Sequence, residues 1–89
     1  MKLILYSKPG CHLCEGLQQK LEQVTAIALS LEIRDITRQE DWFAAYQYEI
    51  PVLHWVTETG SIEPLPQLSP RGSVAQLERM LLERQVTGA

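Results

Sequence analysis

The sequence predicts one α/β domain over residues 1–89, with a four-stranded mixed sheet flanked by three helices in the order β-α-β-α-β-β-α. Three observations support this. Apolar runs typical of strands alternate with apolar residues at helical spacing, Pro and Gly punctuate the runs, and 89 residues allow one domain only. The 45% hydrophobic and 21% charged shares are ordinary for a globular protein.

The N-terminal part predicts a βαβ unit. Residues 2–6 are rich in branched and aromatic side chains, which favours a strand, and Pro9-Gly10 ends it. From residue 11 or 12 onward a helix of three or more turns is predicted. A second strand is expected at about 29–36, and a right-handed crossover would place the two strands side by side and parallel. The apolar residues at helical spacing are Leu13, Leu17, Leu21 and Val24.

A second helix is predicted after the second strand. Thr37 and Glu40 have the spacing of a capping box, in which each side chain satisfies a free amide at the helix start. The aromatic residues that follow have helical spacing, so core packing is favoured over a ligand-stacking role. These residues are Trp42, Phe43, Tyr46 and, further on, Tyr48.

The C-terminal part predicts a hairpin and a third helix. A third strand is expected at 52–56, and the turn at 57–60 leads to a fourth, antiparallel strand at about 61–65. Ser73 and Gln76 form a second capping-box pattern ahead of the last helix, although Ser69-Pro70 offers a start one turn earlier.

Cys11 and Cys14 form a Cys-x-x-Cys pair at the predicted junction of the first strand and first helix. Free amides and the helix dipole stabilise an anion at a helix start, and such positions lower cysteine pKa values from about 8.5 to about 3.5–7.5. The thiolate is the species that attacks a disulfide. Cys11 is therefore the candidate nucleophile, with Lys8 adding positive charge, and Cys14 is placed to resolve a mixed disulfide.

A zinc site is the alternative for this spacing, since zinc uses the same pair. Zinc needs about four ligands, and besides the cysteines the chain offers only His12 and His54. No metal site is therefore expected.

Ile50-Pro51, immediately before the third predicted strand, is the second informative feature. Alone, it fits an ordinary trans proline opening a strand. Combined with the cysteine pair, it favours a cis bond in a tight turn, which would leave the carbonyl and amide of Ile50 facing a thiol substrate.

Together these segments resemble glutaredoxins. Residues Tyr6 to Cys14, with lysine three positions before the first cysteine, are similar to the glutaredoxin active-site segment, and residues 50–53 look like the cis-proline segment of that family. The element order resembles the thioredoxin fold throughout. The Cys-x-Leu-Cys-Glu run is most similar to small glutaredoxin-like proteins, and the resemblance covers nearly the whole chain.

The resemblance implies a thiol–disulfide oxidoreductase with glutathione as co-substrate and no tightly bound cofactor. Cys11 would be the nucleophile, Cys14 the resolving thiol, and Lys8 would assist the thiolate or a glutathione carboxylate. Ile50 and Pro51 would present backbone to glutathione. The amides of the turn at Gly72 and Ser73 would hold its other carboxylate.

Several positions depart from the glutaredoxin pattern. His12 and Leu13 replace the usual proline and aromatic residue, only Gly72 stands where two glycines are common, and no carboxylate follows that turn. His12 either tunes the thiolate or simply faces water. The exchange chemistry is therefore supported by more residues than glutathione is as its partner.

Composition narrows the partners. A net charge of −3 argues against nucleic acid or an anionic membrane surface. The first apolar run is too short for a signal peptide or a membrane span, so we expect the cytoplasm. We also expect a monomer. The expected partners are glutathione or protein dithiols and disulfides.

Two other functions compete with the oxidoreductase. One is a glutaredoxin-like module that senses redox state or binds an iron–sulfur cluster without turnover, and the other is an interaction domain with vestigial thiols.

Two acidic residues have alternative roles. Asp35, after the second strand, either accepts a proton from Cys14, caps a helix or faces solvent. Glu15 follows Cys14 directly and is expected to be solvated, although close approach would oppose thiolate formation.

Overall fold

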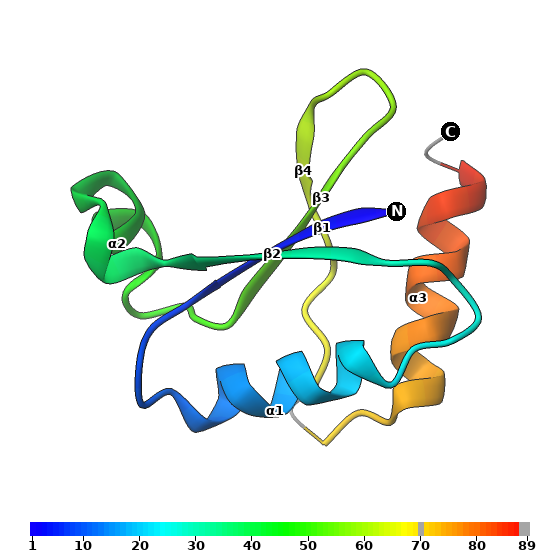
Figure 1. Ribbon diagram of the computed structural model, residues 1–89, viewed down its shortest axis with the longest axis horizontal. Coiled ribbons are helices and arrows are strands. Elements are labelled where there is room, and N and C mark those ends of the chain that lie inside the picture. Colours follow the sequence, from blue (N-terminus) through cyan, green and yellow to red (C-terminus); the bar gives the residue numbers. More distant parts are fainter. Residues whose placement is uncertain (70, 88–89) are drawn as a thin grey trace.

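The computed structural model describes residues 1–69 and 71–87 and has the predicted element order (Figure 1). One short 3₁₀ helix, η1, is added between β2 and α2. The elements are β1 (Lys2–Ser7), α1 (His12–Glu22), β2 (Ser30–Asp35), η1 (Ile36–Arg38), α2 (Glu40–Tyr46), β3 (Val52–Val56), β4 (Ile62–Pro64) and α3 (Val74–Thr87).

The four strands form one mixed sheet in the order β2-β1-β3-β4. β1 pairs parallel with β2 and antiparallel with β3, and β3 pairs antiparallel with β4. Leu5 in the middle of the sheet lies opposite Ile33 on one side and Leu53 on the other. The βαβ unit and the antiparallel hairpin are therefore both confirmed. The central place of β1 puts its carboxyl end, and the loop that follows, at the middle of one sheet edge.

One face of the sheet is covered by α1 and α3. Leu3 and Leu5 point to this face from β1, and Leu77 and Leu81 meet them from α3; all four are at most 1% exposed. Full burial of one such side chain stabilises a fold by about 1.5–3 kcal/mol. Leu21 of α1 belongs to the same buried cluster, so this layer packs α1 against the sheet and positions the cysteine pair at its start.

The opposite face packs against η1 and α2. Ile4, Tyr6 and Ile36 are its buried members, with Trp42 and Tyr46 of α2 packed over them. The guanidinium of Arg34 lies 5.1 Å from the Trp42 ring centroid and 5.7 Å from that of Tyr6, and it pairs with Glu32. Such cation–π contacts let a charged side chain cover an apolar face.

The predicted start of the second helix is wrong. Asp35 accepts hydrogen bonds from the Thr37 amide at 2.9 Å and from the Thr37 hydroxyl at 2.6 Å, so Thr37 lies in η1. α2 instead begins at Glu40 after Gln39, which makes no side-chain cap. The role of Asp35 as a cap is thereby confirmed.

The expected core packing of the aromatic residues holds only in part. Trp42 and Tyr46 pack on the sheet, but Phe43 is 40% exposed and Tyr48 is 92% exposed. Tyr48 lies beyond the end of α2, so the helical spacing no longer applies to it.

The second capping box is confirmed. The Gln76 amide donates to the Ser73 hydroxyl at 3.1 Å, and the Ser73 amide donates to Oε1 of Gln76 at 2.9 Å. α3 therefore begins at Val74, and the alternative start near Ser69 is wrong; Pro70 lies outside the described residues. Over residues 1–69 and 71–87, none of the helices has the length and apolar character needed to span a membrane.

Candidate active site

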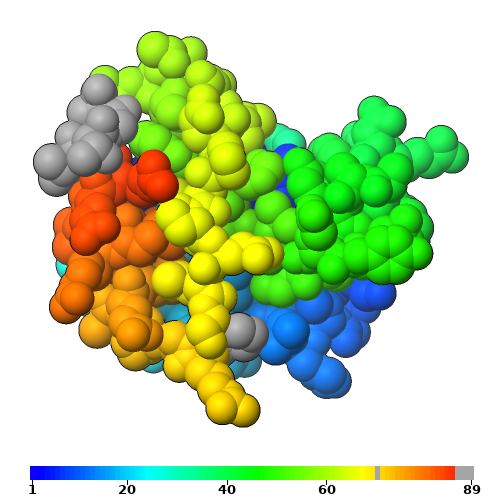
Figure 2. Space-filling model, turned by 180° about the vertical axis from the view of Figure 1, so that it is seen from behind, coloured from blue at the N-terminus to red at the C-terminus, as the bar shows by residue number. Residues whose placement is uncertain are grey.

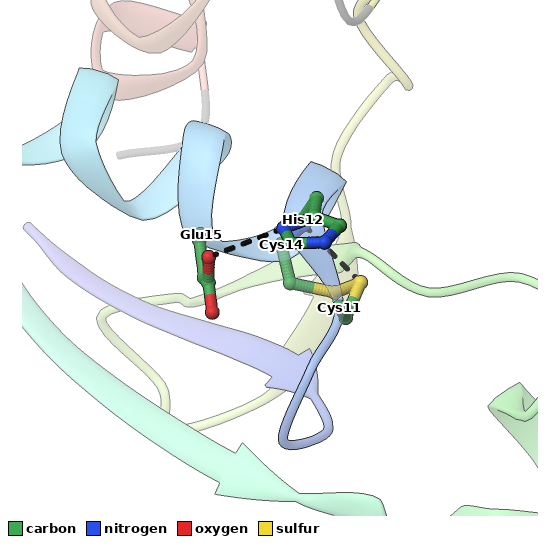
Figure 3. Close-up of a disulfide and its surroundings, with 4 residues drawn as sticks. All are labelled: Cys11, His12, Cys14 and Glu15. Carbon is green, nitrogen blue, oxygen red and sulfur yellow. Dashed lines mark hydrogen bonds and ion pairs between the residues drawn. A yellow bond between two sulfur atoms is a disulfide. The ribbon is translucent and has the colours of Figure 1, made fainter.

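Cys11 and Cys14 are joined as a disulfide at the start of α1, with Cα atoms 5.3 Å apart (Figure 3). The local chain explains the position. Gly10, with φ of 81°, turns the chain after β1, and the Cys11 amide donates to the Lys8 carbonyl at 3.3 Å. Cys11 is the N-cap of α1, so it stands just outside the helix.

The two sulfurs have different surroundings. Sγ of Cys11 accepts a hydrogen bond from the Cys14 amide at 3.2 Å and thus takes the role of a capping side chain. Cys11 is partly exposed, whereas Cys14 is 3% exposed. An incoming sulfur can therefore reach Cys11 more readily than Cys14. The same amide and the helix start would stabilise a thiolate at Cys11 after reduction.

His12 faces solvent. Its side chain is 94% exposed, and Nδ1 lies 3.7 Å from Oε2 of Glu15, one turn along the same helix (Figure 3). Glu15 is therefore solvated and next to a group that can carry positive charge. Lys8 is also exposed, and it contacts the site through its backbone carbonyl, which accepts the hydrogen bond from the Cys11 amide.

The peptide bond between Ile50 and Pro51 is cis. The expectation that both backbone groups of Ile50 face a substrate is wrong for the amide. It donates to the Tyr46 carbonyl at 3.1 Å, because α2 ends in a tight turn directly before the proline. The Ile50 carbonyl accepts no hydrogen bond from residues 1–69 or 71–87.

The turn at Gly72 and Ser73 differs from the expected carboxylate site. The Gly72 amide donates to the Ser69 carbonyl at 2.8 Å, and the Ser73 amide donates to the side-chain oxygen of Gln76. A Cβ at Gly72 would lie 3.1 Å from the Ser69 carbonyl oxygen, so the turn is tight. Both amides are therefore engaged within the fold.

A cavity of about 310 Å³ is lined by His12 and Leu13, the two residues between the cysteines, but neither Cys11 nor Cys14 is among its lining residues. We call it the groove. Four segments line it: the first half of α1, the loop with the cis bond, the segment after β4, and α3. Figure 2 shows the segment after β4 (yellow) crossing the surface between α3 (orange) and the region before β3 (green). The lining residues are His12, Leu13, Gly16, Leu17, Lys20, Glu49, Ile50, Pro51, Leu53, Leu65, Pro66, Gln67, Leu68, Ser69, Leu77 and Met80.

The groove gathers some of the predicted site residues and leaves out others. His12, Ile50 and Pro51 line it, whereas Gly72 and Ser73 do not. No local pattern predicts that Lys20 and Glu49 line the same groove, since they come from elements far apart in the sequence. The exposed Leu13 is the one early signal, because an apolar side chain between two reactive cysteines has no core to fill.

Metal ligands do not cluster in the described part of the chain: no group of three or more His, Cys, Asp or Glu side chains there is placed to hold an ion. The donor set thus fits disulfide chemistry better than a closed zinc site, which needs about four ligands.

Comparisons with known proteins agree with this arrangement. A solved X-ray structure of a Northeast Structural Genomics target protein, XcR50 from X. campestris, matches with a TM-score of 0.62 and 26% sequence identity, covering 91% of this chain and 96% of that chain. No curated protein gives a significant match. The model of the glutaredoxin-like domain family (DUF836) matches residues 2–82. With its thioredoxin-like sheet and the cysteine pair at the start of α1, the chain belongs to the glutaredoxin-like domain family.

Proposed function

We propose that this protein is a thiol–disulfide oxidoreductase that exchanges the dithiol of Cys11 and Cys14 with a substrate disulfide. The observation that carries the proposal is the unequal pair of sulfurs at the start of α1. Cys11 is partly exposed, and its sulfur accepts a hydrogen bond from the Cys14 amide. The Cys14 side chain is buried one turn further on. This inequality suits a nucleophile and a resolving thiol.

The reaction proceeds in two exchanges. The Cys11 thiolate attacks one sulfur of a substrate disulfide, forming a mixed disulfide and releasing the other sulfur as a thiolate that takes up a proton. The Cys14 thiol loses its proton and attacks Cys11, which releases the second substrate thiol. Two electrons pass to the substrate, and the Cys11–Cys14 disulfide of the structure is formed.

A thiol reductant must then restore the dithiol. Glutathione or a protein dithiol fills this role. The proposed compartment is the reducing cytoplasm, where close cysteine pairs are more often catalytic than structural. Lys8 adds positive charge on the exposed loop three positions before Cys11. The engaged amides of Gly72 and Ser73 make the exchange chemistry better supported than a specific glutathione site.

Two substitutions test the proposal. Cys14→Ser leaves the attacking sulfur but removes the resolving one, so incubation with a peptide disulfide should accumulate a mixed disulfide on Cys11, visible as a mass increase. Cys11→Ser should form none and should lose exchange. Iodoacetamide should modify Cys11 before Cys14 in the reduced protein. Equal turnover by Cys11→Ser and the wild type would rule out the proposed function.

A further inference from the structure

β2 lies at one edge of the sheet, and its outer side has no partner strand among residues 1–69 and 71–87. Figure 1 shows β2 in front of β1, with no other element in front of it. An edge strand presents free amides and carbonyls that can pair with another chain. β4, at the opposite edge, has three residues and ends at Pro64, which has no amide to donate. β2 is therefore the edge that is open to a further strand.

The pairing with β1 shows which backbone groups of β2 point outward. The Ser30 amide donates to the Met1 carbonyl at 2.9 Å, so the backbone of Ser30 points to β1. Along a strand the backbone groups of successive residues point to opposite sides. The amides and carbonyls of Leu31, Ile33 and Asp35 therefore point to the free edge, and they offer donors and acceptors along the length of the strand.

The side chains of β2 carry opposite charges two residues apart. Glu32 and Arg34 pair with each other on the face that packs against α2, where the Arg34 guanidinium also lies over the Trp42 ring. Ile33 lies between them on the other face of the sheet and is 42% exposed. The strand thus presents an apolar side chain flanked by one carboxylate and one guanidinium, a pattern that a reversed copy of itself complements.

Charge and backbone direction select one register for two copies of β2 that pair antiparallel about a two-fold axis. The axis must pass through a residue, because outward backbone groups have to meet outward groups of the second copy. An axis at Glu32 places two carboxylates opposite each other, and an axis at Arg34 places two guanidinium groups opposite each other. Like charges directly opposite are destabilising. An axis at Ile33 pairs Ile33 with its own copy and places Glu32 opposite Arg34 twice, while axes nearer the strand ends leave much of β2 unpaired.

We infer that β2 is the contact surface for a second copy of this chain, which pairs antiparallel about Ile33 so that one sheet continues through both copies. The charges of Glu32 and Arg34 then alternate within each chain and between the chains. Asp35, which lies opposite Leu31 of the second copy, already directs its carboxylate to Thr37 of its own chain. This dimer differs from the monomer expected from the sequence, and it requires neither cysteine.

The contact is small, because β2 has six residues. Interfaces below about 1,200 Å² are typical of weak or transient complexes, so the dimer should form as the protein concentration rises. Sedimentation equilibrium of the full chain with a thiol reductant, which keeps the cysteines from linking two chains, measures this. The weight-average mass should rise from one chain toward two between micromolar and millimolar concentrations. A mass of one chain at every concentration would overturn the inference.

Two matched variants locate the contact. Ile33→Lys places two ammonium groups opposite each other at the axis, and lysine on an edge strand is a common means of preventing such pairing. It should weaken association about tenfold or more. Ile62→Lys makes the same change at a 46% exposed isoleucine of β4 and should leave the dissociation constant within about twofold of the wild type. Equal effects of the two variants would contradict the assignment to β2.

Charge reversal tests the register. Glu32→Arg and Arg34→Glu each replace two opposite-charge contacts with like-charge contacts, so each should weaken association about tenfold. The double variant restores opposite charges in the same register and should return to within about threefold of the wild type. Glu63→Arg on β4, with the same change in net charge as Glu32→Arg, is the control and should have no effect. Circular dichroism verifies folding, and Ile33→Lys decides the question if Arg34→Glu does not fold. A folded double variant no stronger in association than either single variant would rule out the register about Ile33.

Discussion

The capping box at the start of α3 links stability to ligand choice. Its two hydrogen bonds are reciprocal, but they use different amides: the Ser73 hydroxyl accepts from the Gln76 amide, and the Gln76 side chain accepts from the Ser73 amide. Ser73→Ala removes the first bond and Gln76→Ala the second. Only Gln76→Ala frees the Ser73 amide, which the family resemblance assigns to a glutathione carboxylate.

Both changes should lower the free energy of unfolding. Loss of a serine N-cap costs about 1 kcal/mol, and loss of the reciprocal neutral hydrogen bond costs about 0.5–1.5 kcal/mol. For a domain of this size, 1 kcal/mol shifts Tm by about 4–8 °C. Ser61→Ala is the matched control, because Ser61 is exposed and its hydroxyl forms no hydrogen bond with residues 1–69 or 71–87. Its Tm should change by less than about 2 °C.

The reactivity with glutathione disulfide should then differ between the two variants. An exposed amide–carboxylate hydrogen bond contributes about 0.5–1 kcal/mol, which corresponds to about a twofold to fivefold rate increase. Gln76→Ala should show this increase in single-turnover thiol release, and Ser73→Ala should not. Equal rates for both variants, or no increase with Gln76→Ala, would show that the engaged amide does not limit glutathione binding.

Three further predictions concern the groove, the core and pH. Glu49→Gln should raise the rate with glutathione disulfide about twofold at low ionic strength and less at 0.5 M salt, because it removes a screened repulsion; a salt-independent change would contradict this. Ile36→Ala, at a side chain with no exposure, should cost about 2–5 kcal/mol in urea unfolding, whereas Ile62→Ala, at a 46% exposed one, should cost under about 1 kcal/mol; equal losses would refute the packing argument. Burial, aided by Arg34, lowers the pKa of His54 below 6.5 in the folded protein, so the unfolded chain binds a proton first as the pH falls. The free energy of unfolding of the wild type should therefore fall more than that of His54→Gln between pH 7.5 and pH 5.5. Parallel pH profiles for the two proteins would contradict the shift.

Local patterns predicted the elements well, but they did not decide between two similar capping boxes. The pattern at Ser73 and Gln76 forms, while the one at Thr37 and Glu40 does not. The difference lies two residues before Thr37, at Asp35. The Asp35 carboxylate accepts hydrogen bonds from both the amide and the hydroxyl of Thr37. Short polar side chains compete in this way with helix caps for hydrogen bonds to nearby backbone groups. Such competition between neighbours is not visible in a four-residue spacing.

The cysteine pair was predictable because its chemistry depends on local geometry. A strand that ends at Ser7, a turn at Pro9-Gly10 and a helix that begins after Cys11 place one sulfur at the cap and the other one turn inside. The groove was not predictable in this way. Leu13, Glu49 and Leu68 meet only after the sheet has been assembled and the segment after β4 has crossed toward α1.

The cysteine pair depends on local geometry and the groove on the assembled fold, so the two affect different aspects of the reaction. The unequal exposure of Cys11 and Cys14 follows from the start of one helix, so any chain with this strand, turn and helix would present one reachable sulfur. Selection among disulfides must come from surfaces that vary independently of that helix start. The apolar groove is lined largely by other segments of the chain, and Gly72 lies in the turn before α3. Changes in the groove should therefore alter which disulfide reacts, while changes at the cysteines alter whether any disulfide reacts.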